Sequence, residues 1–67
     1  MTALFVKAAT GFVEVIAVSE DEHKLQEKAM EYFDERNIEP EYYHGDYMFT
    51  LNGINAWLCF QEVEVLL

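Results

Sequence analysis

The dipeptide Asn52-Gly53 constrains the fold more than any other feature, because it stands between two apolar runs. An Asn-Gly pair in this setting is typical of a two-residue type I′ hairpin turn, in which both residues take a positive φ. Such a turn determines which residues of the two strands face each other. The expected pairs on one face are Leu51 with Ile54, Phe49 with Ala56, and Tyr47 with Leu58. We predict that this large apolar face belongs to the core.

The same register gives the hairpin a second apolar face. It places Met48 opposite Trp57 and Thr50 opposite Asn55, with Cys59 beside them. After Phe60 the alternation changes phase. We therefore expect a bulge near Gln61-Glu62, or a bend into a further strand.

An earlier pair of strands is predicted in residues 3–9 and 12–18, which are apolar, rich in β-branched residues and separated by Thr10-Gly11. Residues 19–37 then predict a helix. Ser19 and Glu22 match a capping box, Asn37 suits a left-handed C-cap, and Pro40 prevents the helix from resuming. The side chains at helical spacing on one face are Leu25, Ala29, Tyr32, Phe33 and Arg36.

Residues 38–47 predict an irregular segment, or a short strand broken at His44-Gly45-Asp46. The whole chain, residues 1–67, therefore predicts a single α+β domain of ββαββ order. Its four-stranded, mostly antiparallel sheet would carry one helix on one face.

One helix covers one face of a sheet, so the opposite face should expose apolar side chains unless residues 63–67 fold over it. We expect Met48 and Trp57 there with Cys59, joined by either Phe5 or by Val13 and Val15. A contiguous apolar patch of this kind usually marks a protein interface.

The charge balance limits the classes of partner. Thirteen acidic residues stand against 4 basic ones, for a net charge of −9, which opposes direct contact with nucleic acid or with an anionic membrane. The N-terminus has no leader pattern and no apolar stretch is long enough for a bilayer. A single cysteine forms no internal disulfide. These features predict a cytoplasmic protein.

Few residues in the sequence suggest a catalytic or metal-binding site. His44 and Asp46 lie close in sequence, yet their segment is also typical of a turn, and His23 lies among acidic residues at the helix start. No nucleophile motif, phosphate loop or metal-binding spacing is present. We expect no enzyme activity, no metal site and no cofactor.

The outer face of the predicted helix is acidic. Glu27, Glu31 and Glu35 stand one turn apart, so their carboxylates recur about every 6 Å, close to the phosphate spacing of a nucleic-acid strand. The face either mimics phosphates or is simply solvated. Exposed tyrosine, methionine and tryptophan are typical anchors of protein interfaces. The residues predicted to bind a partner are Glu27, Glu31, Asp34, Glu35, Tyr43, Met48 and Trp57.

The layout of a strand pair, a helix opening on Ser-x-x-Glu and the late strand "NAWLCFQEVEVL" resembles that of small acidic phage and mobile-element inhibitors. These include anti-CRISPR proteins and inhibitors of host RNA polymerase. The resemblance implies a stoichiometric binder, in the host cytoplasm, of a basic protein that handles nucleic acid. The alternative is a homodimer or assembly subunit joined through the apolar face of the sheet, whose acidity serves solubility.

Overall fold

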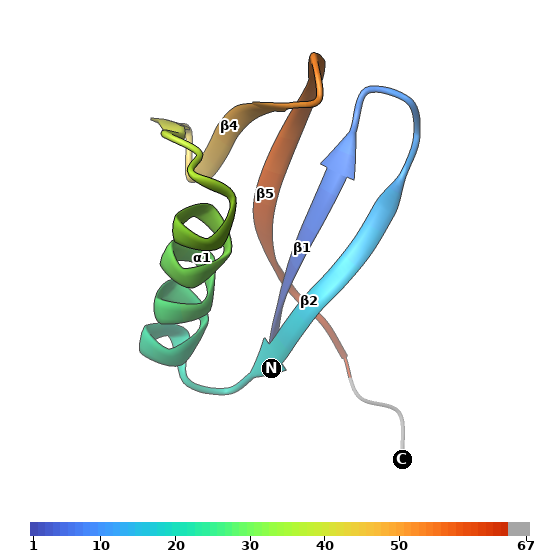
Figure 1. Ribbon diagram of the computed structural model, residues 1–67. Coiled ribbons are helices and arrows are strands. Elements are labelled where there is room, and N and C mark those ends of the chain that lie inside the picture. The colour runs from blue at the N-terminus through green and yellow to red at the C-terminus, as the bar shows by residue number, and fades with distance from the viewer. Residues whose placement is uncertain (65–67) are drawn as a thin grey trace.

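The computed structural model describes residues 1–64 and consists of one helix packed against one antiparallel sheet (Figure 1). In chain order the elements are β1 (Thr2–Ala8), β2 (Val13–Ser19), α1 (Glu22–Arg36), β3 (Glu41–Tyr43), β4 (Asp46–Leu51) and β5 (Ile54–Glu62). The strands lie in the order β2-β1-β5-β4-β3. All four neighbouring pairs are antiparallel, which confirms the α+β class with a single helix on an antiparallel sheet.

The described sheet has five strands rather than the expected four, so the element order is ββαβββ. The additional strand is β3, and its turn explains the difference. His44 and Gly45 have φ values of 49° and 85°, close to the 51° and 80° of Asn52 and Gly53. Two consecutive positive φ values are typical of a type I′ turn. His44-Gly45 therefore forms a second tight hairpin turn instead of breaking a strand.

The register of the β4–β5 hairpin is as predicted, with Leu51 opposite Ile54 and Met48 opposite Trp57. β5 also pairs with β1 along its other edge, from Ala56 opposite Ala8 to Glu62 opposite Thr2. β5 thus lies at the centre of the sheet and joins the first hairpin to the last one (Figure 1).

The expected bulge near Gln61-Glu62 was wrong, because β5 stays in register with β1 to its end. The irregularity lies between β1 and β2 instead. Leu4 pairs with Ala17 and Phe5 pairs with Val15, which leaves Ile16 as an extra residue. An extra residue shifts the alternation of side chains by one position. Whether residues 63–67 fold over the face of the sheet opposite the helix depends in part on residues 65–67, which lie outside the described residues.

The predicted apolar stripe of the helix is confirmed, since Leu25, Ala29, Tyr32 and Phe33 are its buried residues. Asn37, with a φ of 53°, is the left-handed C-cap. The predicted capping box was wrong. Asp21 is the N-cap, and its side chain accepts a 2.9 Å hydrogen bond from the backbone N–H of His23. Because β2 extends to Ser19, the helix begins too late for Ser19 to cap it.

The core lies between α1 and the face of the sheet that we call the front face. Its buried strand residues are Leu4, Val6, Phe49, Ala56 and Leu58. The Phe49 ring lies 5.1 Å from the ring of Phe33 and 6.0 Å from that of Tyr32, both in edge-to-face geometry. Edge-to-face contact is a favoured arrangement of aromatic rings. These ring contacts connect the helix to β4.

Candidate protein-binding surfaces

The face of the sheet that points away from α1 is apolar across four strands, and we call it the back face. Directly paired residues share a face in an antiparallel sheet. Its members are Ala3, Phe5 and Lys7 of β1, Val13, Val15 and Val18 of β2, Glu41 and Tyr43 of β3, Asp46, Met48 and Thr50 of β4, and Asn55, Trp57, Cys59 and Gln61 of β5. Within residues 1–64 no second helix exists to cover this face.

Cross-strand pairs make the back face continuous. One row runs from Val15 through Phe5 to Cys59, and the next runs from Val13 through Lys7 to Trp57 and Met48. The sequence left open whether Phe5 or the two valines would join Trp57. The structure places all three on the back face.

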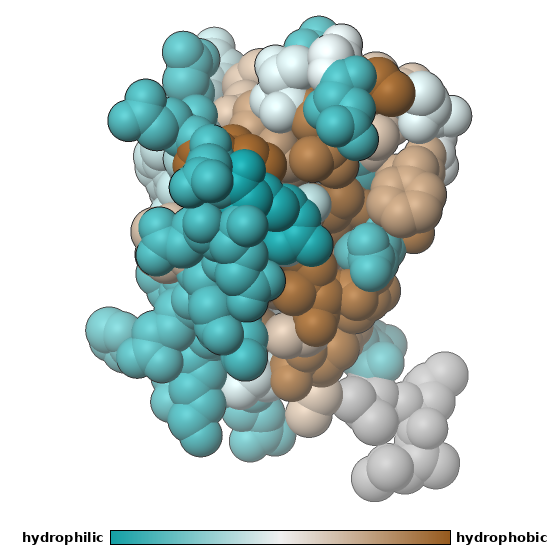
Figure 2. Space-filling view, viewed as in Figure 1, coloured by the Kyte–Doolittle hydropathy of each residue, from teal (hydrophilic) through white to brown (hydrophobic). Residues whose placement is uncertain are grey.

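The rim of the back face is exposed while its middle is closed. Val13 and Val15 are each 60% exposed and Val18 is 49% exposed, whereas Cys59 is buried. Figure 2 shows a brown band of apolar side chains to the right of the hydrophilic surface of α1, in the region where Figure 1 draws β1 and β2. The lysine of this face, Lys7, is exposed, and its ammonium lies 6.0 Å from the Trp57 ring centroid, at the outer limit of a cation–π contact. Exposed Val and Met side chains on the same face as a half-buried Trp are typical of an interface.

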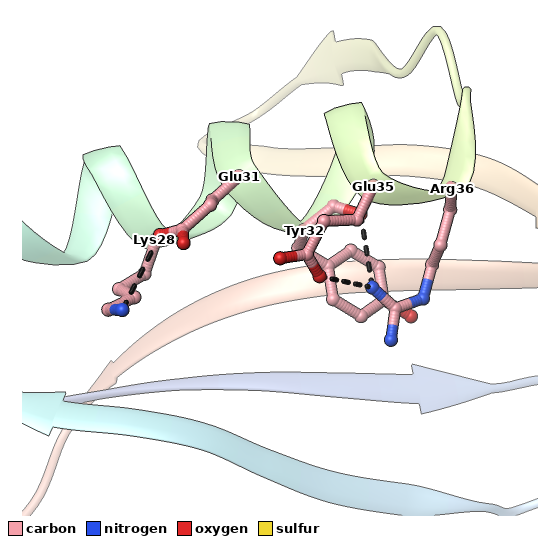
Figure 3. A network of polar contacts seen from close by, with 5 residues as sticks. All are labelled: Lys28, Glu31, Tyr32, Glu35 and Arg36. Carbon is pink, nitrogen blue, oxygen red and sulfur yellow. Dashed lines mark hydrogen bonds and ion pairs between the residues drawn. The ribbon is translucent and has the colours of Figure 1, made fainter.

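The acidic side chains of α1 divide into two groups. Glu31 and Glu35 form ion pairs with Lys28 (3.4 Å) and Arg36 (3.7 Å), and all four side chains are substantially exposed (Figure 3). These residues line a shallow cleft of about 310 Å³ between α1 and β2, together with Glu14. Exposed pairs of this kind contribute little to stability. They nevertheless reduce the negative charge that this flank of α1 offers to a partner.

The second group contains Glu27 and Asp34, which lie on the side of α1 farthest from the sheet. Both are exposed, and neither has an ion-pair partner among residues 1–64. They lie around a shallow depression with Met30, which is 41% exposed. This outer surface of α1 thus offers two carboxylates that no described side chain neutralises.

The structure does not bring the predicted binding residues into one surface. Met48 and Trp57 are direct neighbours on the back face, and Tyr43 lies on the edge strand β3, 61% exposed. Glu27 and Asp34 lie across the helix layer, on the opposite side of the sheet. A flat partner surface therefore contacts either the acidic helix or the back face.

Sequence reasoning missed Val18 as a member of the back face. Strict alternation from Val13 and Val15 would place Ala17 on the back face. Because Ile16 is an extra residue, the alternation shifts by one position, and Val18 lies on the back face instead of Ala17. It also missed a cleft of about 410 Å³ on the helix side, lined in part by Tyr42, Tyr47 and Phe60. The alternation of residues 41–43 was the available signal, since it places Tyr42 beside Tyr47.

The candidate chemical groups form no catalytic arrangement. His44 is exposed in the β3–β4 turn, where its ring packs edge-on against Tyr43 at 4.1 Å. Burial raises the pKa of the Cys59 thiol, and the negative charge of Asp46 raises it further, whereas Lys7 acts in the opposite direction. A thiol with a raised pKa is a weak nucleophile at neutral pH. Among residues 1–64 no group of three His, Cys, Asp or Glu side chains is placed to hold a metal ion.

The one helix within the described residues lacks the length and apolar character required to cross a membrane. Comparison with protein-family models, with curated proteins and with solved structures gives no match for this chain. The physical features of its surfaces are therefore the basis for a functional proposal.

Proposed function

We propose that this chain is a non-enzymatic protein-binding module and that the back face of its sheet is the binding surface. The observation that carries the proposal is the row of exposed apolar side chains on that face. Met48 of β4 lies directly opposite Trp57 of β5, and Val13 and Val15 of β2 lie on the same face on the other side of β1. Val13, Val15 and Met48 are exposed to water. Burying such side chains against a partner gains about 25 cal/mol per Å² of apolar surface.

Two methionines provide a matched test. Met48 lies on the back face at 36% exposure, and Met30 lies on the outer surface of α1 at 41% exposure. The substitutions Met48→Glu and Met30→Glu change charge and size identically on opposite sides of the molecule. Tagged wild type and both variants are used to capture proteins from cell extract. We expect that Met48→Glu loses partners that wild type and Met30→Glu retain.

Trp57 gives a second readout, because it is the single tryptophan of the chain and lies on the back face. Covering it with a partner removes water from the indole and shifts its fluorescence emission to shorter wavelength. An unchanged emission spectrum on addition of a captured partner would contradict binding at this face, as would equal capture by both methionine variants.

A second candidate function is the binding of a basic protein that handles nucleic acid, through the outer surface of α1. The observation that favours it is that Glu27 and Asp34 are exposed without ion pairs among residues 1–64. Glu31 lies one helical turn from Glu27, so a basic groove on the partner would contact carboxylates that are closely spaced. Such binding would weaken with salt, because the Debye length falls from about 10 Å at 0.1 M to about 3 Å at 1 M.

Charge reversal tests this second candidate. Glu27→Lys combined with Asp34→Lys should abolish capture of a basic partner. The control is Glu14→Lys combined with Glu62→Lys, which changes net charge equally at exposed strand positions. Equal losses from both double variants would mean that overall charge, and not the helix surface, governs the binding.

A further inference from the structure

We propose that the partner of the back face is a second copy of this chain, packed sheet to sheet, so that the two α1 helices lie on the outside of the dimer. This inference rests on the proposed function and names the partner. It is carried by the distribution of charge over the molecule, together with the size and composition of the back face.

The acidic residues are concentrated on the helix side. Of the 13 acidic residues, eight fall in residues 20–39, which form α1 and the loops at its ends. On the back face the charged side chains are Lys7, Glu41 and Asp46. Two copies that each carry a net charge of −9 repel each other strongly wherever their acidic surfaces meet. Among residues 1–64, the back face therefore brings together far fewer like charges from the two chains than the helix side does.

Sheet-to-sheet packing also keeps the acidic helices apart. Packed sheets lie about 10 Å apart, and a helix lies about as far again beyond its own sheet, so the two helix axes are separated by roughly 30 Å. That distance is about three Debye lengths at 0.1 M ionic strength, so the repulsion between the helices is largely screened.

Pairing through the edge strand β2 is the main alternative, because β2 is seven residues long and has an open edge. An edge-to-edge dimer with twofold symmetry has both helices on the same side of one continuous sheet. The flank of α1 that faces β2 carries Glu31 and Glu35 (Figure 3). Glu14 of β2 lines the same cleft. This arrangement brings two sets of these carboxylates together. Lys28 and Arg36 neutralise two carboxylates of each set, so it is apolar burial and not charge that separates the two arrangements. Edge pairing leaves Val13, Val15 and Met48 in water, whereas sheet-to-sheet packing buries them.

The size of the back face predicts a weak dimer. Four strands at about 4.8 Å spacing and seven residues at about 3.3 Å rise cover roughly 440 Å² in projection, below the ~800 Å² per partner of a standard interface. Small specific interfaces of this kind belong to the micromolar range of affinity rather than the nanomolar one. The dimer should form as protein concentration rises.

Sedimentation equilibrium tests the inference across roughly 1 µM to 1 mM, the span in which small interfaces associate. We expect wild type to approach twice its 7.8 kDa monomer mass as concentration rises. Met48→Glu should remain monomeric at every concentration, and Met30→Glu should dimerise as wild type does. Circular dichroism checks that both variants are folded.

A second variant decides the question if Met48→Glu does not fold. Val13→Thr, Val15→Thr and Val18→Thr together retain the β-branched shape that strands favour while making the exposed rim of the back face polar. This triple variant should lower the association constant at least tenfold.

Three results would overturn the inference: a wild type that is monomeric throughout, a Met48→Glu variant that still dimerises, or a Met30→Glu variant that does not. A monomeric wild type that captures another protein, which Met48→Glu then loses, would overturn the second copy as partner while leaving the proposed function intact. Equal capture by both variants would instead contradict the proposed function.

Discussion

Phe49 is the residue through which the packing of the core is most directly tested. It lies on β4 at 7% exposure, and its ring contacts those of Phe33 and Tyr32 at centroid distances of 5.1 and 6.0 Å. Truncation of a buried Phe to Ala costs about 3–5 kcal/mol, because apolar contact is lost and a cavity remains. Each aromatic pair contributes about 0.5–1.5 kcal/mol of that loss. Phe49→Ala should therefore destabilise the domain severely.

The size of the chain makes this loss decisive. At about 0.05–0.15 kcal/mol per residue, a 67-residue domain has a free energy of unfolding of roughly 3–10 kcal/mol. Phe49→Ala removes a third of that stability or more. Phe49→Leu keeps an apolar side chain at the site and should cost only about 1–2 kcal/mol.

The assay is urea unfolding followed by far-ultraviolet circular dichroism, with Phe12→Ala as the matched control. Phe12 lies in the β1–β2 loop and is 54% exposed, so the same truncation there should change the free energy of unfolding by about 0.5 kcal/mol or less. If Phe49→Ala and Phe12→Ala lie within about 1 kcal/mol of each other, the aromatic contacts do not hold the helix to the sheet.

Three further predictions address the helix cap, the hairpin turn and the buried thiol. Asp21→Ala should lower the free energy of unfolding by about 1 kcal/mol and Ser19→Ala by less, measured by urea unfolding, because Asp21 caps the helix. Gly53 has a φ of 80°, so Gly53→Ala should cost about 1–2 kcal/mol and lower the Tm; an unchanged Tm would contradict the turn geometry. Burial and Asp46 raise the pKa of Cys59, so the unfolded chain loses this proton first and stability should fall as pH rises through the usual range of a thiol. Asp46→Asn should lower that pKa and speed alkylation of Cys59 at alkaline pH, followed by mass spectrometry.

Local patterns predicted the features that depend on residues close together in the chain. Asn52-Gly53 predicted its turn and the register of β4 with β5, because a two-residue turn leaves only one pairing. The spacing of Leu25, Ala29, Tyr32 and Phe33 predicted the buried face of α1, because the period of a helix is fixed by its geometry. The placement of Met48 and Trp57 together, away from the helix, followed from the same register.

Local patterns were misleading where two local structures competed for the same residues. Ser19 followed by Glu22 matches a capping box, but Ser19 is the last residue of β2, opposite Thr2. The helix therefore takes Asp21 as its cap. His44-Gly45-Asp46 was interpreted as a break in a short strand, whereas His44 adopts the left-handed region that a tight hairpin turn requires.

By itself the sequence determined the α+β class, the helix and its buried face, the last hairpin and the excess of negative charge. The tertiary structure alone decided the strand order, the bulge at Ile16 and the separation of the acidic helix from the back face. Strand order depends on β1 pairing with β5, more than forty residues away along the chain. The periodicity of side chains within one segment does not indicate such a contact. Which distant strands pair depends on how the whole sheet is buried under the helix. The same burial leaves Val13, Val15 and Val18 exposed together on the back face.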